Sequence, residues 1–388
     1  MIENFLKKNI GAITAILFFT PLFIIALQTG VSLTNDSCTY LASAISWESK
    51  GVFLDVFGNE NTIWPPLYSV ILSWVGLNEL NIILLHYFSI LGSIILWIRI
   101  FRSTYSEIKF TIVLSILLST STGFLLCEKF VWSECVFVFL TSLLLINYLK
   151  FLSTSKNNYL IIATISAALL PLQRIAGLYI IILILSGSVL FYTDVVIKNY
   201  KKLLVHYLIG LLPFVLWFSQ SLGGMSEREE ATFDISFLGT VLYDYFLVTS
   251  RYLLPVFHDS FLLAGVILLF VIFYFGLIKG EQKIKLFSFV FIGYVILYIV
   301  TIFLKKAGDG HQEMERFLTP LYPVFCFIMC YLFRRIDLQI KNKRKIFFIS
   351  ILSLWMLYPC SRAIKNSKLY HQLPQKTGVN IPCDFLLQ

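Results

Sequence analysis

The chain has 388 residues, of which 58% are hydrophobic and only 14% are charged, and its mean hydropathy is +0.81. Soluble domains are roughly 45–50% apolar and about 25% charged, so a soluble core cannot hide this much apolar surface and lipid must cover part of it. The net charge of +9 does not indicate a nucleic-acid-binding protein, because lysine and arginine lie in the gaps between apolar blocks rather than on one face or tail.

Eleven apolar blocks approach the roughly 20 residues that a helix needs to cross a bilayer. The first, at 10–33, follows Lys7 and Lys8 and lacks a small-residue cleavage site, so we expect a retained anchor. The other spans are expected at 80–98, 110–127, 131–149, 158–173, 175–193, 203–221, 259–278, 286–304, 317–333 and 346–361. The chain is therefore predicted to be an all-α polytopic membrane protein with one transmembrane domain at 1–361.

The charges of the loops predict an orientation. With a cytoplasmic N-terminus and alternating spans, 19 of the 31 Lys and Arg residues fall in short inner loops, as the positive-inside rule requires. The outer side then receives 17 of the 22 acids. The long outer segments are 34–79, 222–258, 305–316 and a non-cytoplasmic tail at 362–388. We expect a bacterial inner membrane, with the endoplasmic reticulum membrane as the alternative.

The seven cysteines form no Cys-x-x-Cys pair and show no metal-ligand spacing. Cys326 and Cys330 lie four residues apart on an apolar helix, which is typical of small buried thiols. Cys38 and Cys383 fall on the outer, oxidising side, but the sequence alone does not pair them.

The first outer segment carries an acid directly after the first span. Asp36 precedes residues 37–49, whose spacing predicts a helix with Tyr40 on the same face as Glu48. Asp36 either caps that helix or acts as a carboxylate at the lipid–water boundary that accepts a proton from an acceptor hydroxyl.

The same segment ends in Trp64-Pro65-Pro66-Leu67-Tyr68, just before the second span. Two prolines make a stiff entry to a helix, and Trp64 and Tyr68 suit an interfacial aromatic belt. An interface anchor is therefore one interpretation. It explains less well why Asp36 precedes the motif in one amphipathic segment.

Three further motifs follow in order at the outer ends of later spans. They are Trp132-Ser133-Glu134, Gln173-Arg174-Ile175-Ala176-Gly177 and Glu315-Arg316-Phe317-Leu318-Thr319-Pro320-Leu321-Tyr322-Pro323. Together with the two earlier motifs they resemble the GT-C-fold glycosyltransferases, and the branch that includes the protein-mannosyltransferase-like and Rgt-type bacterial sugar transferases. The resemblance covers about residues 10 to 335.

The resemblance implies a GT-C-like bundle whose enzyme takes a sugar from a polyprenyl-phosphate carrier and passes it to an acceptor hydroxyl on the non-cytoplasmic side, usually with inversion. It implies that Asp36 is the general base. Many relatives carry two adjacent acids here, whereas Ser37 follows Asp36, so we expect no metal, with a divalent metal as the alternative. A glycan, a lipid or a protein is the expected acceptor, and membrane lipid surrounds the chain.

A phosphodiester leaving group needs cations, and arginine contacts phosphate in a bidentate manner. The outer-face candidates are Arg174, Arg251 and Arg316, with His311, Lys305 and Lys306 nearby. Arg316 could instead pair with a buried acid, and Glu134 could serve only as a helix cap. The resulting set of expected substrate-binding residues is Tyr40, Glu60, Trp64, Pro65, Tyr68, Glu134, Arg174, Arg251, His311, Arg316 and Tyr322.

Two other functions remain open at this stage. A flippase or transporter of lipid-linked sugars would use the same phosphate and the same arginines, but it needs polar residues along a path across the bilayer. The predicted helix interiors are poor in charge, which favours an enzyme. A polymerase or ligase of lipid-linked glycans is the nearest enzymatic rival.

Overall fold

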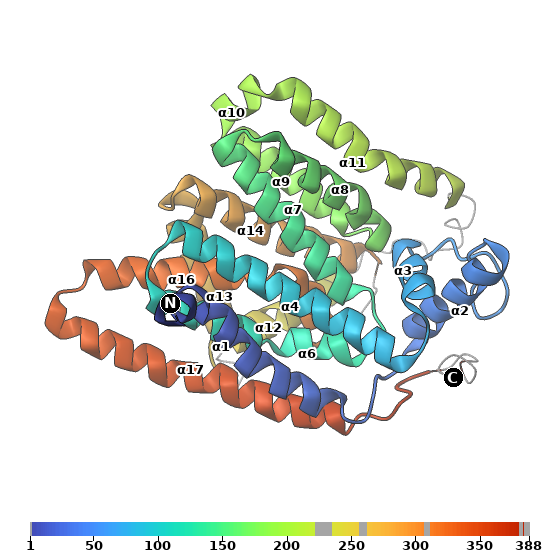
Figure 1. The fold of residues 1–388 in the computed structure, drawn as a ribbon, viewed down its shortest axis with the longest axis horizontal. Helices are drawn as coiled ribbons and strands as arrows, with labels where there is room; N and C mark the ends of the chain where they lie inside the picture. The colour runs from blue at the N-terminus through green and yellow to red at the C-terminus, as the bar shows by residue number, and fades with distance from the viewer. Residues whose placement is uncertain (1, 222–234, 256–261, 306–310, 380–382, 384–388) are drawn as a thin grey trace.

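The computed structural model describes residues 2–221, 235–255, 262–305, 311–379 and 383. Its long helices lie beside one another in a bundle (Figure 1). Two shorter helices, α2 (Asn35–Lys50) and α3 (Leu67–Val75), lie at one end of this bundle, on the right of Figure 1. We call this end the site face and the other end the opposite face.

Helices occupy all eleven predicted spans, and eight of them in the described residues are long and apolar enough to cross a membrane. The elements are α1 (Ile2–Leu27), α4 (Glu79–Thr104), α5 (Ile108–Ser119) with α6 (Thr122–Lys129), α7 (Glu134–Thr154), α8 (Asn157–Gln173), α9 (Gly177–Phe191), α11 (Tyr200–Ser221), α13 (Leu262–Val271) with a π-helical turn at Ile272–Ile278, α14 (Gln282–Lys305), α15 (His311–Leu318) with a 3₁₀ turn at Thr319–Leu321, α16 (Tyr322–Gln339) and α17 (Asn342–His371). A short α10 (Thr193–Lys198) precedes α11.

The outermost helices keep apolar side chains exposed. On α11, Leu204, Leu208 and Leu212 lie four residues apart and therefore form one exposed stripe. On α17, Ile346, Leu354 and Leu357 are exposed in the same way. Soluble monomers rarely expose contiguous apolar surface of this extent, so these helix faces are solvated by lipid. The prediction of an all-α membrane protein is confirmed.

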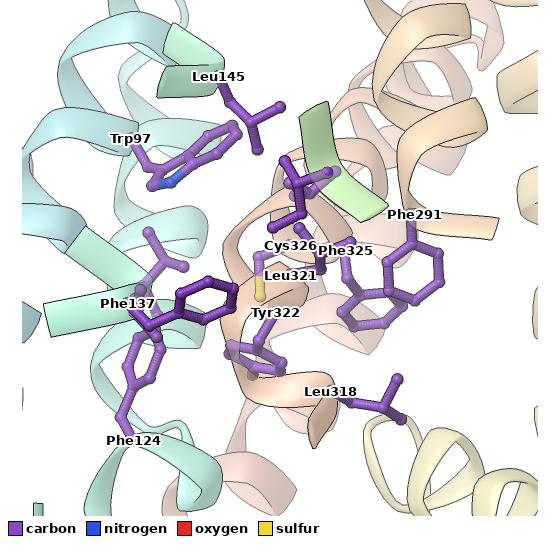
Figure 2. Close-up of a cluster of buried hydrophobic side chains, with 14 of the residues drawn as sticks. Trp97, Phe124, Phe137, Leu145, Phe291, Leu318, Leu321, Tyr322, Phe325 and Cys326 are labelled. Atoms are coloured by element: carbon purple, nitrogen blue, oxygen red, sulfur yellow. The ribbon is translucent and has the colours of Figure 1, made fainter. Parts of the chain in front are cut away.

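The core between the spans combines aliphatic side chains with many aromatic ones. Figure 2 shows Trp97 and Phe137 on one side of Tyr322 and Cys326, with Phe325 and Phe291 on the other. Cys326 and Cys330 are both fully buried free thiols, as their spacing predicted.

Two helix boundaries and one additional helix differ from the sequence prediction. The first helix ends at Leu27 rather than near residue 33, because Gln28 and Thr29 form a turn that the Gly30 N–H closes by donating to the Leu27 carbonyl oxygen. A helix, α12 (Ile235–Arg251), lies inside the segment 222–258, where a loop was expected; its buried Val241, Tyr245 and Val248 have helical spacing. The last helix continues past 361 to His371, since Ala363 and Tyr370 pack against the end of α1.

The ion pairs of the described residues fall at the two ends of the bundle. At the opposite face, Lys109 binds Asp337 with an Nζ–Oδ2 distance of 2.7 Å. There Arg334 also binds Glu107 with an Nε–Oε1 distance of 2.8 Å, and this ion pair lowers the pKa of Glu107. The remaining pairs gather at the site face.

Candidate active site

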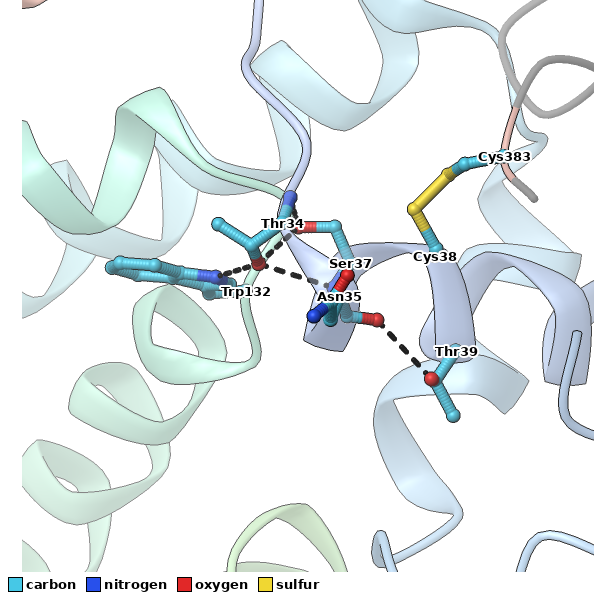
Figure 3. Close-up of a disulfide and its surroundings, with 7 residues drawn as sticks. All are labelled: Thr34, Asn35, Ser37, Cys38, Thr39, Trp132 and Cys383. Carbon is cyan, nitrogen blue, oxygen red and sulfur yellow. Dashed lines mark hydrogen bonds between the residues drawn. A yellow bond between two sulfur atoms is a disulfide. The ribbon is translucent and has the colours of Figure 1, made fainter. Parts of the chain in front are cut away.

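The first turn of α2 presents Asp36 at the site face. Thr34, not Asp36, caps this helix: its Oγ1 accepts a hydrogen bond from the Ser37 backbone N–H, and the Ser37 hydroxyl accepts one from the Thr34 N–H. Thr34 Oγ1 also accepts a bond of 2.8 Å from Trp132 Nε1 (Figure 3). The interpretation of Asp36 as the helix cap is therefore wrong, and its carboxylate is left for other contacts.

Asp36 heads a chain of ion pairs drawn from four distant parts of the sequence. Arg316 Nη2 donates to Asp36 Oδ2 at 2.9 Å, and Arg316 Nε donates to Glu134 Oε1. Arg174 Nη1 donates to the same oxygen of Glu134. The Glu134 side chain is 1% exposed and that of Asp36 is 24% exposed. The chain thus runs from a buried carboxylate outward to an accessible one.

The local backbone explains why Arg174 reaches this chain. Arg174 follows the last residue of α8, and the Gly177 N–H bonds back to the Arg174 carbonyl oxygen at 2.8 Å. A Cβ atom on Gly177 would lie only 2.7 Å from the Leu170 carbonyl carbon, so a side chain there would push α9 away from α8. The Arg-x-x-Gly spacing therefore allows a tight turn that holds the guanidinium at the site face.

Aromatic rings cover both arginines. The Arg316 guanidinium carbon lies 3.9 Å from the ring centroid of Trp132, and the Arg174 guanidinium carbon lies 5.9 Å from that of Phe317. Such cation–π contacts add to the ion pairs where water is excluded. Trp132 also bonds to the cap of α2, so one indole ring fixes Arg316 relative to Asp36.

Three aromatic residues, Tyr40, Trp64 and Tyr68, pack together close to Asp36. Tyr40 contacts the rings of Trp64 and Tyr68 at centroid distances of 5.9 and 5.0 Å. The Tyr40 hydroxyl lies 3.2 Å from the Ser133 hydroxyl, and that of Tyr68 lies 2.7 Å from His86 Nε2. Burial raises the pKa of the Tyr40 hydroxyl well above its usual range, so Tyr40 stays neutral and can only share a proton in hydrogen bonds. The two motifs of the first segment therefore meet in space.

A second charged cluster adjoins the first through α15. Arg362 Nη2 binds both carboxylate oxygens of Glu315, at 2.9 and 3.0 Å, and the Thr122 hydroxyl donates to Glu315 Oε1. Arg362 Nη1 also donates to the Arg251 carbonyl oxygen at 3.1 Å. Sequence reasoning missed Arg362 because the last helix was expected to end just before it. The available signal was the position of Arg362 itself, an arginine directly after the last apolar block.

Arg251 lies close enough to Arg362 and Glu315 to be affected by the charges of both. In the described residues its guanidinium takes part in no ion pair, and burial together with the nearby Arg362 lowers its pKa. The negative charge of Glu315 interacts favourably with both Arg251 and Arg362. The set of Arg251, Arg362 and Glu315 therefore has a surplus of one positive charge, whereas Asp36, Glu134, Arg174 and Arg316 balance one another.

Other predicted site residues lie apart from this chain of ion pairs. Glu60 is exposed and pairs through its backbone with Leu54, and Pro65 is a buried residue of the first outer segment. The Tyr322 hydroxyl donates to the Leu117 carbonyl oxygen at 3.1 Å inside the core. The side chains of His311 and Lys305, and all of Lys306, lie outside the described residues.

The described residues include no group of three or more His, Cys, Asp or Glu side chains that could hold a metal ion. The expectation that the reaction needs no metal stays a prediction.

A disulfide joins Cys38 to Cys383 across 345 positions of sequence (Figure 3). The tail that carries Cys383 also pairs with the segment before α2: the Leu33 N–H donates to the Gln375 carbonyl oxygen at 2.7 Å, and the Thr377 N–H donates to that of Leu33 at 2.9 Å. The C-terminal tail is thereby attached to the helix turn that presents Asp36.

Reduction of this disulfide should destabilise the site face. Removing a cross-link typically costs about 2–4 kcal/mol of the free energy of unfolding. We expect Cys38→Ser/Cys383→Ser to lower the thermal unfolding midpoint and to remove its dependence on reductant, which the unmodified protein should show. Alkylation of both thiols in the unreduced protein would contradict this expectation.

The arrangement of helices is similar to that of a solved membrane protein. The crystal structure of ArnT from Cupriavidus metallidurans in the apo state matches with a TM-score of 0.62 at 11% sequence identity, over 92% of this chain and 75% of that chain. The crystal structure of ArnT bound to undecaprenyl phosphate matches with a TM-score of 0.63 at the same identity and coverage. Neither a protein-family model nor a curated protein matches the sequence. The likeness confirms the predicted GT-C-like fold.

Proposed function

We propose that the protein is an integral membrane glycosyltransferase that moves a sugar from a polyprenyl-phosphate carrier to an acceptor hydroxyl, with Asp36 as the general base. The observation that carries the proposal is the accessible Asp36 carboxylate, held by Arg316 at the end of a buried chain of ion pairs. The fold it shares with ArnT, one structure of which holds undecaprenyl phosphate, supports the same donor class.

In this reaction the acceptor oxygen attacks the anomeric carbon of the sugar. The acceptor proton passes to Asp36, a new carbon–oxygen bond forms, and the bond from the anomeric carbon to the phosphate oxygen breaks. The phosphate leaves with the electron pair on the polyprenyl carrier, and one displacement inverts the anomeric configuration. Arg316 engages Oδ2 of Asp36, and in the described residues Oδ1 accepts no hydrogen bond, so this oxygen can take the proton.

The departing phosphate gains negative charge, and the balanced chain around Asp36 has none to spare. Arg251 and Arg362 have a surplus, and they adjoin Asp36's partner because Glu315 and Arg316 are consecutive. We assign the donor phosphate to these two arginines. Cations placed where charge develops in the transition state are a large term in catalysis.

Arg251→Gln should therefore weaken donor binding. Loss of one charge-assisted hydrogen bond costs about 1.5–3 kcal/mol, so the KM for the lipid-linked donor should rise about 10- to 100-fold. The KM for the acceptor should change little. Lys365→Gln, which removes an exposed cation from α17 on the same face, is the matched control and should leave both KM values unchanged. An unaltered donor KM in Arg251→Gln would show that the donor phosphate does not bind at Arg251.

We also propose that the site face is non-cytoplasmic. The Cys38–Cys383 disulfide supports this, because disulfides persist in oxidising compartments, and the basic loops at the opposite face agree with a cytoplasmic location there. A bacterial inner membrane fits both features.

The experiment that tests the function is a mass-spectrometric comparison of cell-surface glycans and lipid-linked sugars with and without the gene. The proposal predicts the loss of one defined sugar and the accumulation of its polyprenyl-phosphate-linked form on the non-cytoplasmic leaflet. Accumulation on the cytoplasmic leaflet alone would indicate a flippase instead. Shortened glycan chains with an intact repeat unit would indicate a polymerase.

A further inference from the structure

A groove between α8 and α11 near the opposite face has no role in the proposed chemistry. Its volume is about 550 Å³, and it is lined by Asn157, Leu160, Ile161, Thr164, Ile165, Lys201, Lys202, Val205, His206 and Ile209. Four of the apolar lining residues, Ile161, Ile165, Val205 and Ile209, are more than half exposed, so the groove opens toward the surrounding membrane.

The lining follows helical spacing on both walls. On α8 the lining residues recur at intervals of three and four from 157 to 165, and on α11 from 201 to 209. Each stretch rises by about 12 Å at 1.5 Å per residue. The groove is therefore a straight apolar channel long enough for about half of an acyl chain.

The mouth of the groove is cationic. Lys201 and Lys202 stand at the start of α11, and Lys202 Nζ donates to Asn157 Oδ1 at the start of α8 with a distance of 2.9 Å. Both helices begin at this end, so their N-terminal dipoles add positive potential there. None of the groove-lining residues is an acid. The mouth is thus suited to an anion and the channel to a hydrocarbon chain.

Hydrogen bonds and ring contacts hold Thr164 and His206, which line the groove, in place. The Thr164 hydroxyl donates to the Leu160 carbonyl oxygen at 2.7 Å, so it accepts from His206 Nδ1, also at 2.7 Å. The His206 ring lies 5.5 Å from the ring of Tyr148 and 4.7 Å from that of Tyr207. His206 is therefore fixed between α8, α7 and its own helix, and the groove is formed before any ligand enters.

We propose that this groove binds an anionic glycerophospholipid from the leaflet at the opposite face. Its phosphate would contact Lys201 and Lys202, and one acyl chain would lie along Ile161, Ile165, Val205 and Ile209. A soluble phosphate would leave the apolar channel empty, and a zwitterionic lipid would bring its own cation to the two lysines. This inference does not depend on sugar transfer.

The test uses the full-length protein in detergent with equal amounts of phosphatidylglycerol and phosphatidylcholine of identical chains, and native mass spectrometry to count retained lipids. Phosphatidylglycerol should be retained in preference. Lys201→Gln/Lys202→Gln should lower its affinity about 30-fold, roughly fivefold for each lysine near an anionic headgroup. Ile165→Trp, which fills the channel and keeps both charges, should also lower retention.

Lys279→Gln/Lys283→Gln removes two lysines from the same face outside the groove and should keep the wild-type retention. Unchanged phosphatidylglycerol retention in either groove variant would overturn the proposal. Displacement of phosphatidylglycerol by glycerol phosphate alone, or by an equal amount of a polyprenyl phosphate, would also overturn it. Because all these side chains are at the surface, unfolding midpoints should confirm that each variant is folded.

Discussion

Asp36→Asn should greatly slow sugar transfer while the protein still inserts and folds. Asparagine keeps the shape of the side chain and can still accept from Arg316, but it cannot take the acceptor proton. A positioned general base contributes about 10²- to 10⁴-fold, so kcat should fall by that factor. Asp36 is partly exposed and Arg316 keeps Glu134, so the free energy of unfolding should change by only about 1 kcal/mol.

The matched control is Glu48→Gln, which removes an exposed acid from the same helix and should transfer at the wild-type rate. Rates would be measured with reconstituted protein and a polyprenyl-phosphate-linked sugar. Asp36→Asn should bind this donor with unchanged affinity. Near-normal turnover by this variant would show that Asp36 is not the general base, even though it lies at the site face.

Glu134→Gln should cost both stability and activity. Glu134 is buried and accepts from Arg174 and Arg316, so loss of its charge removes one ion-pair partner from each of these two arginines. Removing one partner of a buried ion pair costs about 3–5 kcal/mol. We expect a lower unfolding midpoint, and a loss of transfer that persists at temperatures where the variant is folded, because Arg316 no longer holds Asp36 in place.

Asp337→Asn provides the comparison at the opposite face. It removes a buried carboxylate whose partner, Lys109, is 42% exposed and can turn to water. Transfer should therefore be retained. If Glu134→Gln transfers normally whenever it is folded, then Glu134 supports the bundle only and does not position the base.

The sequence predicted the bundle well because hydropathy and charge act locally. Each span shows its apolar length directly, and the breaks at Arg174 and before Tyr322 coincide with proline or glycine. Boundaries were less accurate where packing decides them. Residues 362–371 are polar enough to resemble a tail, yet Ala363 and Tyr370 pack against α1 and extend the last helix.

The partners within the site were not predictable, because they lie far apart in the chain. Sequence spacing identified Asp36, Glu134, Arg174 and Arg316 as separate candidates, and Arg316 was expected to pair with an acid or to bind phosphate. The fold brings all four into one chain that leaves Arg316 paired with Asp36 and Glu134. The phosphate ligands that we propose are therefore Arg251, which was a candidate from the sequence, and Arg362, which was not.

A structure determined with a polyprenyl-phosphate-linked sugar would test the central claim most directly. It should place the phosphate against Arg251 and Arg362, and the anomeric carbon where a hydroxyl bonded to Asp36 could reach it. A donor phosphate bound at the opposite face, or a sugar beyond the reach of any hydroxyl held by Asp36, would contradict the proposed reaction.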